Sequence, residues 1–166
     1  MLKAMNVHEF VFTSLDGSAM PLRNYQGQPV LIVNTASKCE FTPQYRALER
    51  IWSDYRQSGL IIIGMPCNDF GNQEPGTEEE IAEFCTTQYN IKFPMTKKYN
   101  VMGKSAHPVF RAVREEFGDD VMPRWNFYKY LFDHSGQMVD FWPSKVAPND
   151  LAITHQIECN LHSWVL

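Results

Sequence analysis

Residues 29–43 read PVLIVNTASKCEFTP, and they decide the fold class. The run at 29–35 is short, almost continuously apolar and rich in β-branched residues, which is typical of a strand buried on both faces of a parallel sheet. Thr42 and Pro43 then predict the start of a helix, with Thr42 as N-cap and Pro43 at the first helical position. Cys39 therefore stands between a buried strand and the first turn of a helix.

Residues 44–65 complete a strand–helix–strand unit. Apolar residues recur at helical spacing after Pro43, and they are Leu48, Ile51, Trp52 and Tyr55. Gly59 can adopt the left-handed conformation that ends a helix, and residues 60–65 are a second apolar run. This order predicts a βαβ unit with a right-handed crossover and two neighbouring parallel strands.

The remaining segments predict a small N-terminal hairpin, more helices and a late hairpin. Asp16-Gly17 joins the two arms of the first hairpin, and Thr77 begins a helix with a capping-box pattern. The other expected elements are an extended segment at 93–96, a helix at 107–117, a hairpin over 127–142 and a helix at 149–161. The sequence thus predicts one α/β domain over residues 1–166, with a central mixed sheet flanked by helices.

The charge balance of the chain limits the kinds of binding partner that we expect. The chain has 15 basic and 19 acidic residues, a net charge of −4, and no block of lysine or arginine. Neither nucleic acid nor an anionic membrane is therefore an expected partner. Residues 1–12 lack the apolar core of a secretory signal, and no apolar run is long enough to span a bilayer. We expect a cytoplasmic protein without integral membrane association.

The four cysteines are expected to act as individual thiols. They are Cys39, Cys67, Cys85 and Cys159, and no pair has the C-x-x-C spacing of a zinc site or dithiol motif. The histidines are scattered, and no glycine-rich phosphate loop is present. The sequence therefore predicts neither a metal site nor a bound cofactor.

Cys39 has the position of a reactive thiol. The N–H groups at a helix N-terminus favour a thiolate over a thiol, and the thiolate is the nucleophile. Lys38 adds a neighbouring positive charge, whereas Glu40 acts in the opposite direction. The alternative is that Cys39 is a small buried apolar residue, which is common for cysteine.

Three blocks of the sequence resemble the signatures of the glutathione peroxidase family. They are NTASKCEFTPQY at 34–45, GMPCNDFGNQEPG at 64–76 and WNFYKYL at 125–131. They occur in the order found in that family, and the similarity extends over nearly the whole chain. The resemblance implies a thioredoxin-like fold and a peroxidase that reduces hydrogen peroxide and organic or lipid hydroperoxides.

The resemblance also implies a catalytic tetrad of Cys39, Gln73, Trp125 and Asn126. The amide groups and the indole N–H can donate hydrogen bonds to a thiolate and to the developing charge on a peroxide oxygen. Taken singly, Trp125 is more often a core residue, and Gln73 and Asn126 are more often loop residues.

Cys85 matches the second cysteine of the thioredoxin-using members of the family. The resemblance implies that it resolves oxidised Cys39 by forming a Cys39–Cys85 disulfide, for which we expect the helix after Thr77 to unwind in part. The alternative is a core cysteine at helical spacing from Ile81. The implied reductant is thioredoxin, with glutathione as the alternative.

The sequence is also compatible with other functions, and it bears on the oligomeric state. The same thiols suit a peroxide sensor that passes oxidation to a partner protein, and the fold also suits a binding domain without redox activity. Tetrameric relatives carry an extra segment before the Trp-Asn block, whereas residues 118–124 form a short connection here, which implies a monomer or at most a weak dimer.

The sequence departs from the family pattern at two positions in the matched blocks. Glu40 replaces the usual glycine after the reactive residue, and Asp69 stands where glutamine is usual. Neither change removes a catalytic group, and both bear on the reactivity of Cys39.

Overall fold

The central sheet of the computed structural model has four strands in the order β4-β3-β5-β6. The strands are β3 (Val30–Thr35), β4 (Ile61–Pro66), β5 (Lys129–Phe132) and β6 (Met138–Trp142). The structure describes residues 4–165, and side chains are described as far as residue 161. β3 pairs in parallel with β4 and antiparallel with β5, so the sheet is mixed, as the sequence predicts.

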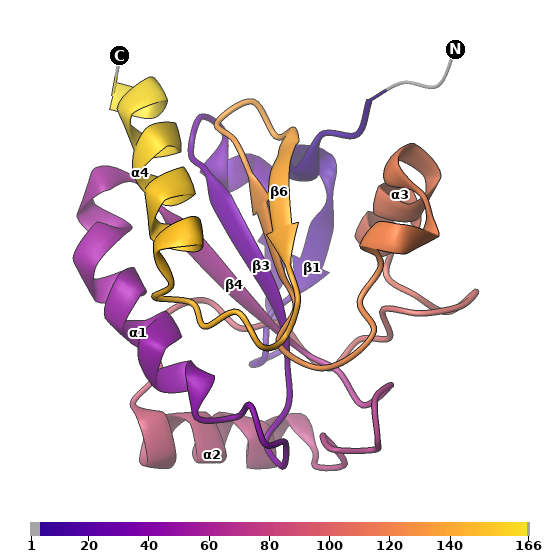
Figure 1. Ribbon diagram of the computed structural model, residues 1–166. Coiled ribbons are helices and arrows are strands. Elements are labelled where there is room, and N and C mark those ends of the chain that lie inside the picture. Colours follow the sequence, from indigo (N-terminus) through magenta and orange to yellow (C-terminus); the bar gives the residue numbers. More distant parts are fainter. Residues whose placement is uncertain (1–3, 166) are drawn as a thin grey trace.

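Helices cover both faces of this sheet. They are α1 (Gln44–Tyr55), α2 (Glu78–Tyr89), α3 (Pro108–Phe117) and α4 (Leu151–Val165). In Figure 1, α1 and α4 lie on one side of the sheet, α3 lies on the other side, and α2 runs across the lower end. The predicted βαβ unit is confirmed, because α1 connects the parallel strands β3 and β4.

The alternation of side chains along β3 divides the interior into two cores. Val30 and Ile32 point into one core, which also contains the buried residues of α3. Leu31 and Val33 point into the other, which contains the buried residues of α1, α2 and α4. Because successive side chains in a strand face opposite sides, a continuously apolar strand serves both cores.

The N-terminal hairpin forms a separate two-stranded sheet. Its strands are β1 (Val11–Thr13) and β2 (Ala19–Pro21), which pair antiparallel around the Asp16-Gly17 turn. The extended segment at 93–96 is present as isolated bridges from Thr96 to Ser14 and from Met95 to Gly64. Within residues 4–165 there are also four short 3-10 helices, and they are η1 (Val7–Glu9), η2 (Leu22–Tyr25), η3 (Arg56–Ser58) and η4 (Asp119–Val121).

The start of α1 differs from the prediction. The helix begins at Gln44 with Pro43 as its N-cap residue, and no side chain caps it. The Thr42 hydroxyl instead accepts from the Cys39 N–H (2.9 Å) and donates to the Ala36 carbonyl (2.8 Å). Thr42 therefore closes the turn that holds Cys39 and does not cap α1.

Candidate active site

Cys39 lies in the tight turn that joins β3 to α1. Its side chain is almost buried, and the Phe41 N–H donates to its sulfur at 3.3 Å. The backbone N–H of Lys38 donates to the Gln73 carbonyl at 3.0 Å. The turn that carries Cys39 is thus fixed both to the start of α1 and to the loop that carries Gln73.

Gln73 and Asn126 form a direct pair in the interior. The Asn126 side-chain nitrogen donates to Gln73 Oε1 at 3.0 Å, and Asn126 is fully buried. Because the Gln73 oxygen accepts this bond, the two N–H groups of its amide are left as donors toward the surroundings. Asn126 Oδ1 is buried and has no partner among the residues that the structure describes.

Trp125 packs against the loop that carries Gln73. Its ring lies 6.2 Å from the Phe70 ring, measured between centroids. A Cβ atom at Gly71 would lie 2.9 Å from Trp125 Cη2, and Gly71 has a φ of +66°. Glycine at position 71 therefore permits both the left-handed turn and the close approach to the indole.

The structure brings three of the four predicted tetrad residues together. Gln73 and Asn126 are hydrogen-bonded, and Trp125 is covalently next to Asn126 and packs near Gln73. Cys39 is connected to them through the backbone of Lys38. In the described part of the chain, none of the three donates a hydrogen bond to the Cys39 sulfur, whose donor is the Phe41 N–H.

Asn34, which the sequence reasoning did not select, holds the Trp125–Asn126 turn in place. Its amide donates to the Trp125 carbonyl and accepts from the Tyr128 N–H, both at 2.9 Å. Its backbone carbonyl accepts from Phe127, whose φ is +64°. The sequence feature that could have revealed this role is an asparagine in an otherwise apolar strand. A buried amide must find hydrogen-bond partners.

Ser144 and Lys129 hold the same turn from the other side. The Ser144 hydroxyl donates to the Asn126 carbonyl. The fully buried Lys129 ammonium donates to the Ser144 carbonyl at 3.1 Å and to the Val146 carbonyl at 2.5 Å. Burial lowers the pKa of Lys129 to about 7. A lysine surrounded by carbonyl groups, rather than by a carboxylate, therefore supports the position of Asn126.

Replacing Lys129 with methionine is expected to change how stability depends on pH. Because the folded-state pKa is about 7 and the unfolded-state pKa is about 10.4, the unfolded chain binds more protons between these values. The free energy of unfolding should therefore rise with pH above about 7, by up to about 1.4 kcal/mol per unit for this group. Urea unfolding of the reduced protein between pH 7 and 8.5 measures this slope, which Lys129→Met should remove.

Lys145→Met is the matched control for this measurement, because Lys145 is exposed and lies between Ser144 and Val146, whose carbonyl groups accept from Lys129. It should keep the wild-type slope. The range stops near pH 8.5 because Cys67 and Cys85 contribute with the opposite sign above it: burial raises their thiol pKa values to about 12 and about 11. An unchanged slope in Lys129→Met would contradict the prediction.

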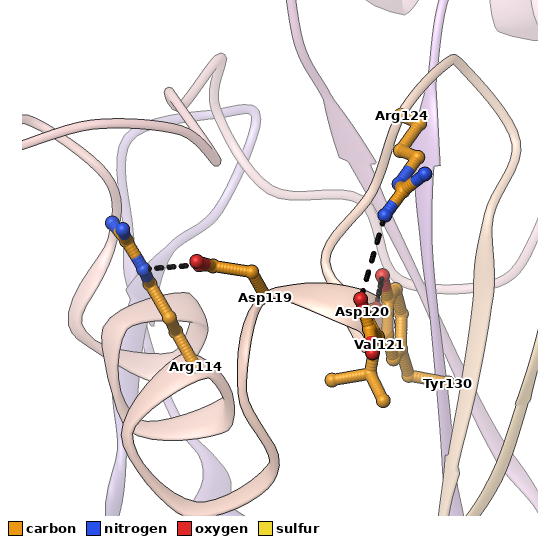
Figure 2. A network of polar contacts seen from close by, with 6 residues as sticks. All are labelled: Arg114, Asp119, Asp120, Val121, Arg124 and Tyr130. Atoms are coloured by element: carbon orange, nitrogen blue, oxygen red, sulfur yellow. Dashed lines mark hydrogen bonds and ion pairs between the residues drawn. The ribbon is translucent and has the colours of Figure 1, made fainter.

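The segment that leads into Trp125 is short and cross-linked by polar contacts. Figure 2 shows Arg114 paired with Asp119 at 2.6 Å and Arg124 paired with Asp120 at 3.8 Å. The Tyr130 hydroxyl donates to the Val121 carbonyl at 2.7 Å. The ion pairs are exposed and therefore contribute little stability, whereas the buried tyrosine ties η4 to the sheet.

Cys85 lies on the inner face of α2 as a buried free thiol. Burial raises its pKa to about 11, the Tyr45 hydroxyl acts to lower it, and the Glu74 carboxylate acts to raise it. Cys67 is fully buried, which agrees with a structural role, and Cys159 is exposed on α4. The structure therefore contains Cys39 and Cys85 as two separate thiols on different elements.

The two departures from the family pattern have different surroundings. Asp69 Oδ2 accepts from the backbone N–H groups of Val101 (2.7 Å) and Met102 (3.1 Å), so it fixes the loop before Gln73 to a neighbouring loop. Glu40 is exposed.

Residues 4–165 contain no group of three or more histidine, cysteine, aspartate or glutamate side chains that could hold a metal ion. Over the same residues, no helix has both the length and the apolar character that a bilayer crossing requires.

The chain is similar to a known protein family and to individual proteins of that family. Residues 7–114 match the family model described as glutathione peroxidase. The glutathione peroxidase-like peroxiredoxin gpx1 of Schizosaccharomyces pombe is 45% identical over 138 residues, which cover 82% of this chain and 87% of that protein. The hydroperoxy fatty acid reductase gpx1 of Synechocystis is 39% identical over 154 residues, which cover 88% and 91%.

Solved structures show the same architecture. The crystal structure of Trgpx in apo form has a TM-score of 0.77 and 29% identity, and the match covers 96% of this chain and 97% of that one. A thioredoxin family thiol:disulfide interchange protein from Chlorobium tepidum matches at a TM-score of 0.64 and 16% identity, over 97% and 99% of the two chains. The fold is thioredoxin-like.

Proposed function

Because this chain belongs to the glutathione peroxidase family, we propose that it reduces hydroperoxides by thiol chemistry centred on Cys39. The observation that carries the assignment is the position of the Cys39 sulfur. It accepts the Phe41 N–H at the approach to α1, in a turn bound to the Gln73 loop. The Phe41 N–H can donate to negative charge on this sulfur, and the thiolate is the form of cysteine that acts as a nucleophile.

In the first step, the Cys39 thiolate attacks the terminal oxygen of the hydroperoxide. The O–O bond breaks, the sulfur is oxidised to a sulfenic acid, and water or an alcohol leaves after taking a proton. The Gln73 amide and the Trp125 indole donate hydrogen bonds to the peroxide oxygens as charge develops. Asn126 orients Gln73 through the bond to its Oε1, which directs the Gln73 NH2 group outward.

In the second step, Cys85 attacks the sulfenic sulfur and forms a disulfide with Cys39, and the former sulfenic oxygen leaves as water. A dithiol protein of the thioredoxin type then reduces the disulfide by thiol–disulfide exchange. Both thiols are buried, and α2 is a complete helix, so we propose that α2 opens locally before the disulfide forms. The enzyme acts as a monomer in this scheme.

Turnover is expected to be faster with thioredoxin than with glutathione, because an intramolecular disulfide is opened by a dithiol in two linked exchanges. The measurement is peroxide-dependent NADPH oxidation, with thioredoxin plus its reductase compared against glutathione plus its reductase. We expect about tenfold or greater preference in kcat/KM, which corresponds to roughly 1.4 kcal/mol.

Faster turnover with glutathione would instead assign Cys85 a structural role. Turnover with neither reductant, combined with oxidation of Cys39 by peroxide, would favour a peroxide sensor that transfers oxidation to a partner protein.

A further inference from the structure

Glu74 is a buried carboxylate that the reaction described above does not use. It directly follows Gln73, and only 1% of its surface is exposed. Its Oε2 atom is buried and makes no hydrogen bond within the described residues. A buried carboxylate without a full set of partners is costly, so its presence beside a catalytic loop calls for a chemical explanation.

Glu74 shares a pocket with the segments that carry Cys39 and Cys85. The pocket has a volume of about 280 Å³, and Ser37 and Lys38, immediately before Cys39, line it. Ile81 and Phe84, on the turn of α2 that leads to Cys85, line it too. The carboxylate also lies close enough to Cys85 for its charge to act on that thiol.

The backbone around Glu74 is held firmly. The Lys98 ammonium donates to the Glu74 carbonyl at 3.1 Å and to the Gly76 carbonyl at 2.7 Å. These bonds fix the loop from which α2 starts, so Glu74 keeps its place if the helix beyond it loosens. Glu74 is therefore placed to act on the Cys85 thiol while α2 moves.

The charged and titratable groups around Glu74 come from four elements. Burial raises the pKa of Glu74, whereas Ser37, Lys98 and Lys38 favour its ionised form. Its charge also acts on Cys85 and on the buried hydroxyl of Tyr45, and Glu80 lines the same pocket. A carboxylate with a raised pKa binds a proton more readily than an ordinary one, so it is a better proton acceptor.

We propose that Glu74 is the proton acceptor for the Cys85 thiol in the disulfide-forming step. The inference rests on the proposed function, because it requires Cys85 to be the resolving cysteine. Glu74 takes the proton from the Cys85 S–H bond, and the sulfur attacks the Cys39 sulfenic sulfur. The S–S bond forms, the S–O bond breaks, and the departing oxygen takes the proton back from Glu74 and leaves as water.

The need for such a group follows from the state of Cys85 in the folded protein. Burial raises the pKa of its thiol to about 11, so the thiolate that must attack is scarce while α2 is closed, and a base held beside the start of α2 can take the proton as the helix opens. General base assistance typically contributes about 10²- to 10⁴-fold to such a step.

The test separates the two half-reactions in Glu74→Gln, which keeps the size of the side chain and removes its basicity. One equivalent of peroxide is added to reduced protein, and peroxide loss is followed together with the appearance of the Cys39–Cys85 disulfide by acid quench and mass spectrometry. We expect peroxide loss within about twofold of wild type and disulfide formation slowed by about 10²-fold. In the variant, the disulfide rate should rise about tenfold per pH unit, because hydroxide then replaces the carboxylate.

Two further variants complete the test. Glu79→Gln makes the same charge change on the exposed side of the first turn of α2 and should resolve at the wild-type rate. Glu74→Asp should recover part of the rate and the wild-type pH profile. A wild-type disulfide rate in Glu74→Gln, or an equal loss in both half-reactions, would overturn the proposal.

Failure of the proposed function gives a different result. If Cys85→Ser still recycles with thioredoxin, Cys85 is not the resolving cysteine, whatever Glu74 does. If Cys85→Ser accumulates the sulfenic acid while Glu74→Gln resolves normally, only the role of Glu74 is wrong.

Discussion

A Cys39→Ser variant is expected to lose hydroperoxide reduction by on the order of 10⁴-fold or more, down to background, because loss of a catalytic nucleophile costs this much in comparable enzymes. Serine is nearly the same size and can still accept the Phe41 N–H, so the turn should keep its shape. A serine hydroxyl, however, is not ionised near neutral pH and does not form a stable oxidised intermediate with peroxide. Peroxide consumption under thioredoxin-coupled conditions measures the loss.

Cys159→Ser is the appropriate control, because Cys159 is the exposed cysteine of α4 and lies outside the site. It should keep the wild-type rate, and both variants should show thermal unfolding close to wild type. Peroxidase activity that survives in Cys39→Ser at a tenth or more of the wild-type rate would show that another group is the nucleophile.

The βαβ unit could be predicted from the sequence because its signals are local. The apolar run of β3 and the helical spacing after Pro43 lie within one continuous stretch, and the capping box at Thr77 is observed with Glu80 as its partner. The hairpin around Asp16-Gly17 is confirmed for the same reason. Each of these signals lies within one short continuous stretch of the chain.

The contacts that hold the candidate site in place could not be predicted from local sequence. Asn34 binds a turn that is 91 residues away, and Ser144 binds Asn126 from 18 residues away. Such contacts depend on the register between β3 and β5 and on the loop after β6. The family blocks predicted the candidate residues Cys39, Gln73, Trp125 and Asn126, but they did not indicate that Lys129 is buried among carbonyl groups.

Thr42 shows how a correct local signal can serve a different purpose. A threonine before Pro43 predicts a helix cap, yet its hydroxyl accepts from the Cys39 N–H and donates to the Ala36 carbonyl, both of which precede it in the chain. The hydroxyl satisfies backbone groups in either place, so the pattern alone does not distinguish the two. In the structure, Thr42 shapes the turn that carries Cys39.

The proposed opening of α2 is consistent with how this helix is built. The helix is well made at both ends, with a capping box at Thr77 and a left-handed Asn90 at the C-cap. Its inner face is small, because Ile81 and Cys85 are its fully buried residues. A helix with good ends and few buried contacts can detach as a unit at modest cost, which is the property that a resolving helix requires.

A Cys85→Ser variant is expected to reduce the first equivalent of peroxide at the wild-type rate and then to turn over roughly 10²-fold more slowly with thioredoxin. A tethered thiol acts at an effective concentration of the order of millimolar, whereas a reductant present at about 10 µM must attack the sulfenic acid directly. Trapping with dimedone and mass spectrometry should find the Cys39 sulfenic acid in this variant and the disulfide in wild type. Cys67→Ala, which removes the other thiol buried near the site, should still form the disulfide. Full thioredoxin-dependent turnover in Cys85→Ser would mean that α2 need not open and that its buried cysteine serves only to pack the helix.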